Sequence, residues 1–451
     1  MTGLRNDRSY LFYQTDHPRP TLDRAEGIYM WDTEGNRFID GSSGAMVCNI
    51  GHSNPHVPDA MRRQMEKSTF GYRLHFVTEA SEALAAKTVS LAWPGMDRVF
   101  FVSGGSEAVE SAMKLARQYA LAIGQGSRWK VLSRWPSYHG CTLGALSITG
   151  YDSLTDPFRP MMQAMPKVPA PRAWLDGLDP AAAATGQHYA DLLEQKILEE
   201  GPESVLAFIL EPIGGASTGA LVPPRGYMEA VREVCTRHGV LLIHDEVMSG
   251  GGRTGRFFGA QHWTAAPDIL AISKGFGAGY VPLGAMVARG DLVEAVLANG
   301  GFLHGFTYAG NPLACATGLA VIEEIERQQL MTNAKTVGIL LKSELLALMD
   351  RYPFIGDVRG MGLLLAFELV ADSRTRAPFP PAFRAFDRLT EAAYQRGLII
   401  YPRRSRGGYS GDHLIVAPPM ITTPAQVGEI IGKLTDALEA FARDIPPGML
   451  S

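Results

Sequence analysis

Residues 205–211 read VLAFILE, residues 240–245 read VLLIHD and residues 269–275 read ILAISKG. Each stretch is a short apolar run that leads into an ionisable residue, namely Glu211, Asp245 or Lys274. Apolar runs of this length are typical of strands buried on both faces, as in a parallel sheet. Because ligands bind beyond the carboxyl ends of such strands, we expect these three side chains at one edge of one sheet.

The pattern around these stretches predicts the fold class. From residue 99 to about residue 285, apolar runs alternate with helical stretches, which is typical of an α/β sheet with crossover helices. After Pro353 the pattern changes to short strand-like runs between helical stretches near residues 381–396 and 424–442. We therefore predict an α/β protein with a large domain, built on a mostly parallel sheet flanked by helices, and a smaller α+β domain.

The N-terminal segment is predicted to join the smaller domain. Residues 28–31 and 37–40 flank a turn-rich stretch and read as a hairpin, and no partner strand for it is evident nearby. The expected division has three parts: an N-terminal segment contributing to the small domain (1–50), the large domain (51–328) and the C-terminal small domain (329–451).

Composition and charge argue against several classes of protein. Of the 451 residues, 46% are hydrophobic and 20% charged, and the formal net charge of −4 gives no reason to expect a nucleic-acid partner. No apolar run approaches the roughly 18 residues of a membrane span, and residues 1–20 lack the apolar core of a signal peptide. We therefore expect a cytoplasmic protein with no membrane partner.

The cysteines suggest neither disulfides nor a zinc site. They lie far apart in the sequence, without a CxxC pair, at Cys48, Cys141, Cys235 and Cys315. Such spacing is typical of reduced thiols.

Lys274 and Asp245 suit one cofactor, pyridoxal phosphate. That cofactor needs a lysine amine to hold its aldehyde as a Schiff base and an acid to keep its pyridine nitrogen protonated. The glycines that follow Lys274 leave room around the amine. An alternative is a metal site made by Asp245 with its neighbours His244 and Glu246. Adjacent residues of a strand point to opposite faces, so we expect no metal there.

A candidate phosphate site precedes these residues. The strand-like run at 99–102 leads into Ser103-Gly-Gly105-Ser106, and a helical pattern follows. A glycine turn before a helix N-terminus presents free amides and the helix dipole to an anion, although many such turns only cap a helix. Tyr138 lies soon after another strand-like run, where its ring could stack on a flat cofactor or be an ordinary loop aromatic.

Nearly the whole chain resembles the class III, or omega, aminotransferases, which are pyridoxal phosphate enzymes of fold type I. The resemblance rests on an ordered series of segments: SGGSEAVESAMKLAR (103–117), SYHG (137–140), EPIGG (211–215), HDEVMSGGGRTG (244–255), SKGFGAGYVPLGA (273–285), FTYAGNP (306–312) and GDHLIVAPP (411–419). It implies the aspartate aminotransferase-like architecture of that fold type.

The resemblance also implies a role for each matching residue. Lys274 would be the Schiff-base lysine and general acid/base, and Asp245 would pair with the pyridinium nitrogen. Tyr138 and Val247 would cover the two ring faces. The phosphate would be held by Gly105 and Ser106, and by Thr307 reaching across from a partner subunit, which implies a homodimer with shared active sites. Glu211 would pair with a movable arginine that otherwise holds the substrate carboxylate.

The sequence departs from the family pattern in two places. Many omega-aminotransferases have a tryptophan where this chain has Met46, so a bulky wall of the substrate pocket is expected to be absent. The arginine that usually precedes the segment at 411–419 has three candidates here, Arg403, Arg404 and Arg406, in a stretch that reads as a glycine- and serine-rich loop. We rank Arg404 first for its central place.

These features predict a transaminase that moves an amino group from a primary amine or omega-amino acid to a keto acid such as pyruvate. The alternative is a pyridoxal phosphate-dependent ammonia- or phospho-lyase on the same scaffold. A non-catalytic protein is disfavoured because both Lys274 and Asp245 are present.

Overall fold

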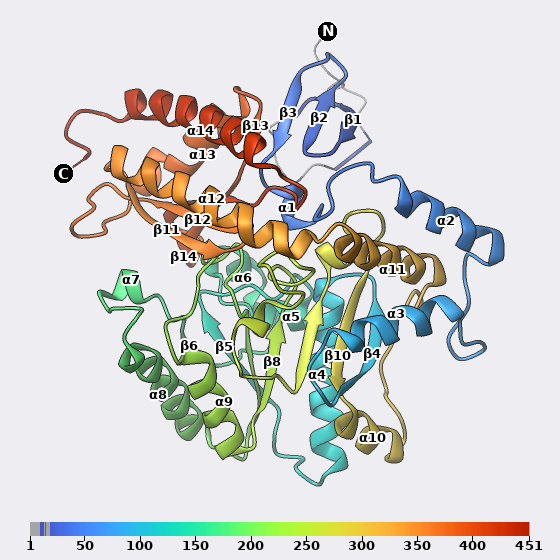
Figure 1. Ribbon diagram of the computed structural model, residues 1–451. Coiled ribbons are helices and arrows are strands. Elements are labelled where there is room, and N and C mark those ends of the chain that lie inside the picture. Colours follow the sequence, from blue (N-terminus) through green and yellow to red (C-terminus); the bar gives the residue numbers. More distant parts are fainter. Residues whose placement is uncertain (1–9, 13, 15–18, 451) are drawn as a thin grey trace.

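The computed structural model describes residues 10–12, 14 and 19–450 of the chain. Figure 1 shows a large domain built around one sheet, with a second layer of helices and strands above it. The strands at residues 22–40 and the helix at residues 424–444 lie on the side of this second layer. No helix within the described residues has the length and apolarity needed to cross a bilayer.

The large domain is organised by a seven-stranded sheet with the order β4-β10-β9-β8-β7-β5-β6. Its strands are β4 (Met96–Val102), β5 (Lys130–Trp135), β6 (Lys167–Pro169), β7 (Val205–Leu210), β8 (Leu241–Asp245), β9 (Ile269–Ile272) and β10 (Gly284–Arg289). All neighbouring pairs are parallel except those of β10, which runs antiparallel to β4 and β9. The predicted mostly parallel sheet is therefore confirmed.

Helices cover both faces of this sheet because its central strands are buried on both sides. Along β7, Ala207 and Ile209 face one helix layer, whereas Phe208 and Leu210 face the other. The first layer contains α4 (Gly105–Ala122) and α10 (Gly290–Ala298). The second contains α8 (Ala183–Glu200) and α9 (Tyr227–His238) over β7 and β8, and α3 (Glu79–Ser90) and α11 (Pro312–Arg327) over β9 and β10.

The C-terminal part of the chain forms an antiparallel sheet under long helices. The strand order is β11-β12-β15-β14, with bounds β11 (Ile355–Met361), β12 (Leu364–Leu369), β14 (Tyr401–Arg406) and β15 (Ser410–Val416). The helices are α12 (Leu330–Arg351), α13 (Ala385–Tyr394) and α14 (Pro424–Asp444).

The N-terminal strands pair with this C-terminal part. The strands β1 (Leu22–Glu26), β2 (Tyr29–Asp32) and β3 (Arg37–Asp40) form a meander, and β3 pairs in parallel with β13 (Leu398–Ile399). The hairpin thus finds its partner more than 350 residues along the chain. We propose the division at residues 50/51 and 328/329 on this basis, since the second boundary lies between α11 and α12.

Shorter elements complete the chain. They are α1 (Ser43–Met46), α2 (His56–Lys67), α5 (Leu143–Ser147), α6 (Asp152–Thr155), α7 (Ala173–Asp176) and four 3₁₀ turns (Asp156–Met161, Gly259–His262, Lys274–Phe276 and Pro381–Phe383). Among them α1 lies in the connector between β3 and α2, beside the site described next.

Candidate active site

A pocket of about 160 Å³ lies at the carboxyl ends of β7, β8 and β9. It is lined by Gly105, Ser106, Tyr138, His139, Gly140, Glu211, Ile213, Asp245, Val247, Met248 and Lys274. The three ionisable residues that end the apolar runs therefore meet at one sheet edge, because their strands are neighbours in the sheet and run in the same direction.

Lys274 supplies the only lysine amine of this lining. It lies two residues beyond β9 and has a φ of 48°, a left-handed conformation that is uncommon for a residue with a side chain. Burial lowers the pKa of Lys274 from 10.5 to about 8, although the nearby carboxylates of Asp245 and Glu211 act in the opposite direction. A larger fraction of this amine is therefore neutral and nucleophilic than for a lysine in water.

Asp245 is held in place from two sides. Its Oδ1 accepts a hydrogen bond from the amide of Val247 at 3.0 Å, and its Oδ2 lies 2.8 Å from Nδ1 of His139. Both side chains are buried, and Nε2 of His139 has no hydrogen-bond partner. His139 directly follows Tyr138 in the segment at 137–140, but no pattern in the sequence indicates its role. Only the fold shows that it reaches the carboxylate at the end of β8.

The start of α4 has the features of an anion site. The helix begins at Gly105, and no side chain caps it, so its first amides are free to receive a ligand. A Cβ on Gly105 would lie 3.0 Å from the Val247 side chain, and one on Gly140 would lie 2.6 Å from Oγ of Ser106. These glycines keep the space open, and Ser106 adds a hydroxyl to the lining.

Tyr138 and Glu211 are linked through the backbone. The Glu211 carboxylate accepts hydrogen bonds from the Tyr138 amide at 3.4 Å and the Gly215 amide at 2.9 Å. It also lies 3.9 Å from the buried guanidinium of Arg134. Burial is the main cause that raises the pKa of both Glu211 and Tyr138, to about 12 for the tyrosine.

Met46 and Thr307 lie outside the lining of this pocket. Met46 is buried, in one apolar cluster with Ile213 and Met248, which do line it. It therefore belongs to the apolar cluster that supplies part of the pocket wall. Thr307 is exposed in a turn and does not line the pocket of its own chain.

The three candidate arginines lie in a strand and not in a flexible loop, which corrects the interpretation of this stretch. Residues 401–406 form β14, and they pair with β15 despite the glycines at the connecting turn. Arg404 was ranked first, but its Nε donates to Asp412 at 2.9 Å, its Nη2 donates to the Pro381 carbonyl and its guanidinium lies 4.6 Å from the Phe386 ring centre. Its charge is thus engaged on the face of β14 that packs against α13.

Arg403 lies on the opposite face of β14. Its guanidinium covers the ring of Tyr401, which packs in the same cluster as Met46, and its charge contributes to lowering the pKa of Lys274. Arg406 donates to the Arg376 carbonyl instead. Because successive side chains of a strand point to opposite faces, Arg403 and Arg404 are separated. A loop would not predict this separation.

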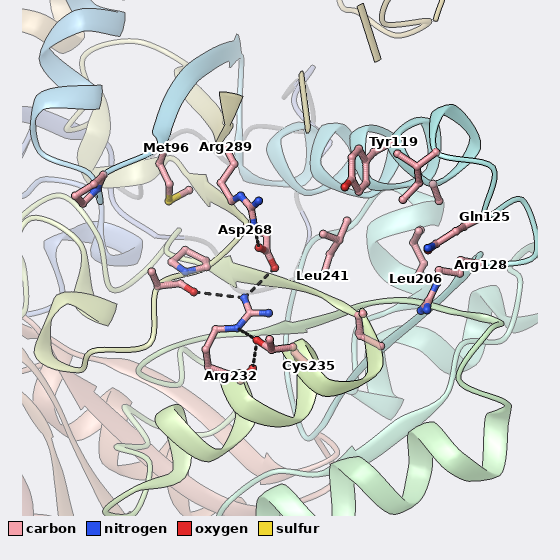
Figure 2. A pocket seen from close by; sticks show the side chains of 18 residues that line it. Met96, Tyr119, Gln125, Arg128, Leu206, Arg232, Cys235, Leu241, Asp268 and Arg289 are labelled. Atoms are coloured by element: carbon pink, nitrogen blue, oxygen red, sulfur yellow. Dashed lines mark hydrogen bonds and ion pairs between the residues drawn. The ribbon is translucent and has the colours of Figure 1, made fainter. Parts of the chain in front are cut away.

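A second cavity, of about 480 Å³, lies at the amino ends of β7 and β8. The pocket described above lies at the other end of the same strands. Figure 2 shows Arg232 and Arg289 converging on Asp268 within the second cavity. Each guanidinium is 2.8 Å from the aspartate, so these charges are paired with one another. This cavity contains none of the predicted site residues.

The donor set of the first pocket fits pyridoxal phosphate. A lysine amine, a buried carboxylate beside an imidazole, an aromatic ring and an uncapped helix N-terminus surround one space. These are the groups that the aldehyde, pyridine nitrogen, ring and phosphate of that cofactor require.

Comparison with known proteins agrees with this donor set. The sequence profile of the family "Aminotransferase class-III" matches residues 12–438. The putrescine–pyruvate aminotransferase of Pseudomonas aeruginosa is 36% identical, covering 93% of this chain and 91% of its own. An (S)-enantioselective omega-transaminase from Thermomicrobium roseum superimposes with a TM-score of 0.89 and 35% identity, covering 96% of each chain. An amine transaminase from an uncultivated Pseudomonas species, solved with pyridoxal phosphate bound, gives 0.90 and 34%, covering 97% of this chain and 99% of its own. The chain belongs to the class III aminotransferases and is a pyridoxal phosphate-dependent transaminase of fold type I.

Proposed function

We propose that this transaminase moves the amino group of a primary amine or omega-amino acid to a keto acid such as pyruvate. The observation that carries the proposal is that an apolar wall and a positive charge both lie at one pocket. An apolar wall contains Ile213 and Met248, supported by Met46, and the cation of Arg403 lies close enough to affect Lys274. An apolar wall suits an amine without a carboxylate, whereas a guanidinium suits a keto acid. The putrescine–pyruvate relative supports pyruvate as the acceptor.

In this proposal, the residues of the chain divide the work of transamination. Bound pyridoxal phosphate supplies an electron sink for the carbon that loses its proton. Lys274 holds the cofactor and moves protons to and from that carbon, which its lowered pKa favours. Asp245, oriented by His139, would keep the pyridine nitrogen protonated. Tyr138 and Val247 would flank the cofactor ring, and the α4 N-terminus with Gly105 and Ser106 would bind the phosphate.

We assign the substrate carboxylate to Arg403 in place of Arg404. Of the three arginines, Arg403 has an exposed side chain, and its hydrogen bonds are to the hydroxyl of Tyr401 and the carbonyl of Pro402. Both partners belong to its own strand, so the guanidinium can leave them without opening a contact between elements. Glu211 would accept the guanidinium when an uncharged amine occupies the site.

We also propose a homodimer with shared active sites. Two segments, 68–78 and 299–311, are neighbours through the Phe70 and Tyr308 rings, whose centres are 6.0 Å apart. Together they expose large apolar side chains at Phe70, Leu74, Phe76, Val77, Leu303 and Tyr308. Such a patch is typical of a protein interface. Thr307 lies within it, as expected for a residue that reaches the phosphate site of a partner.

The proposal is tested by mixing the enzyme with pyruvate and a panel of amines and measuring alanine. We expect alanine in equal amount to the carbonyl product, and none when the amine or pyruvate is omitted. Lys274→Ala, which lacks the reacting amine, is the control. Release of ammonia or phosphate from an amino-alcohol derivative without a keto acid would indicate the lyase alternative instead.

A further inference from the structure

Three side chains that could bind a metal converge in the connector that follows β3. Within the described part of the chain, Asp40, Cys48 and His52 form the one group of this kind, with their potential ligand atoms all within 4.8 Å of one another. None of the three lines the cofactor pocket. We propose that Asp40, Cys48 and His52 form a zinc-binding site, separate from the pyridoxal phosphate site.

The donor set selects the metal. A thiolate, an imidazole and a carboxylate are the ligands that Zn²⁺ takes in proteins, whereas Mg²⁺ and Ca²⁺ prefer oxygen alone. Cys48 and His52 are separated by three residues, a spacing that lets both side chains reach one ion. Asp40 joins them from the end of β3, so the set could not be recognised from cysteine spacing.

The site is already ordered by its backbone. The Asp40 carboxylate accepts hydrogen bonds from the Gly44 amide at 2.8 Å and 3.0 Å, and its Oδ2 lies 2.9 Å from Nε2 of His52. The backbone of His52 forms a two-way bridge with Gly27, and the Cys48 amide donates to the Ser43 carbonyl. The bonds from Gly44, Gly27 and Ser43 lie outside the ligand set and orient the ligands, as outer hydrogen bonds do in metal sites. The Asp40–His52 contact joins two ligand atoms, so zinc would replace it and release the proton that the two side chains share.

The cluster is also reachable from solvent. The Asp40 side chain is 1% exposed, but that of His52 is 16% exposed and Cys48 is partly buried. A water molecule can therefore complete a tetrahedral set. The nearby buried Arg253 directs its guanidinium to Asn49, Ser43 and three backbone carbonyls, not to Asp40.

Zinc at this site would fix the connector that carries Met46 and Asn49. Asn49 donates to the Gly251 carbonyl, and its side chain occupies the space that a Cβ on Gly275, the residue after Lys274, would need. Binding would therefore stabilise the contact between the connector and the large domain. Because zinc would bind the assembled three-ligand cluster more tightly than the unfolded chain, it should raise the thermal midpoint of unfolding.

The test is isothermal titration of the holoenzyme with zinc chloride in a buffer free of chelators and thiols. We expect one zinc per chain, affinity at least tenfold lower in Cys48→Ser and in His52→Gln, and unchanged affinity in Cys141→Ser, which removes an exposed thiol outside the cluster. Zinc should raise the thermal midpoint of the wild type but not that of Cys48→Ser.

A second measurement identifies the ligand directly. Cobalt(II) added to the holoenzyme should give a thiolate-to-cobalt charge-transfer band in the difference spectrum, and this band should be absent in Cys48→Ser. Zinc binding that is the same in Cys48→Ser as in the wild type, equal binding of magnesium, or a cobalt spectrum without the thiolate band would overturn the proposal.

Discussion

At the scale of the residue, burial lowers the pKa of the Lys274 amine. The shift of its pKa from 10.5 to about 8 makes the neutral amine roughly 300-fold more abundant below pH 8 than for an ordinary lysine. We predict that the rate at which cofactor-free enzyme captures pyridoxal phosphate rises about tenfold per pH unit below 8 and levels off above it. The measurement is stopped-flow absorbance across pH, with free N-acetyl-lysine as the control. A rate that keeps rising to pH 10 would show that the amine is not perturbed.

Asp245 acts through charge at the same scale. An asparagine keeps the size and the contact with the Val247 amide but cannot hold the pyridinium proton. We predict that Asp245→Asn binds the cofactor yet loses on the order of 10²- to 10⁴-fold in turnover, as when other key electrostatic groups are removed. Half-reaction kinetics, followed by loss of the cofactor's visible absorbance after adding amine, measure this step. Turnover within tenfold of the wild type would contradict the role.

At the scale of the element, β14 presents two neighbouring arginines to different surroundings. Arg404 compensates the buried Asp412, whose side chain is 3% exposed, so Arg404→Ala should lower the free energy of unfolding by about 3 kcal/mol. The same change should leave the KM for pyruvate nearly unaltered. Arg403→Ala should do the opposite: little change in stability, and a KM for pyruvate raised at least tenfold, with the KM for an uncharged amine unchanged.

This pair of variants is its own matched control, since the residues are adjacent and the substitution is identical. Arg406→Ala adds a third position on the same strand. Urea denaturation and initial-rate kinetics give the two readouts. If Arg403→Ala leaves the kinetics with pyruvate unchanged, the carboxylate is bound by another group.

At the scale of the whole molecule, the exposed apolar patch predicts how the chain assembles. Phe76 and Leu303 are 71% and 83% exposed in the single chain. We predict that the double variant Phe76→Glu, Leu303→Glu sediments as a monomer and loses cofactor affinity, because each site would lose Thr307 of its partner. Leu198→Glu changes an exposed leucine on α8, on the other side of the molecule, and serves as the control (Figure 1).

Thr307→Ala separates assembly from phosphate binding. This variant should remain a dimer in analytical ultracentrifugation and bind pyridoxal phosphate roughly tenfold more weakly, the cost of about one hydrogen bond to a charged group. A wild-type enzyme that is an active monomer would contradict both expectations.

The sequence by itself determined the central sheet and the meeting of its three strand-end ionisable residues. The runs that end at Glu211, Asp245 and Lys274 are continuous apolar segments, and such segments can be buried on both faces only in the middle of a sheet covered by helices. Parallel neighbours place their carboxyl ends together, so the position of these residues in the sequence already implied a common site.

Only the tertiary structure decided the contacts between segments that are distant in sequence or alike in pattern. Glycine and serine around residues 403–411 indicate a loop, but pairing with β15 makes a strand and sends Arg403 and Arg404 to opposite faces. The N-terminal hairpin is paired by β13, and His139 reaches Asp245 across 106 positions of sequence. Local periodicity fixes which side of an element is apolar, whereas sheet register and long-range pairing fix which polar groups meet, and that information is spread over the whole chain.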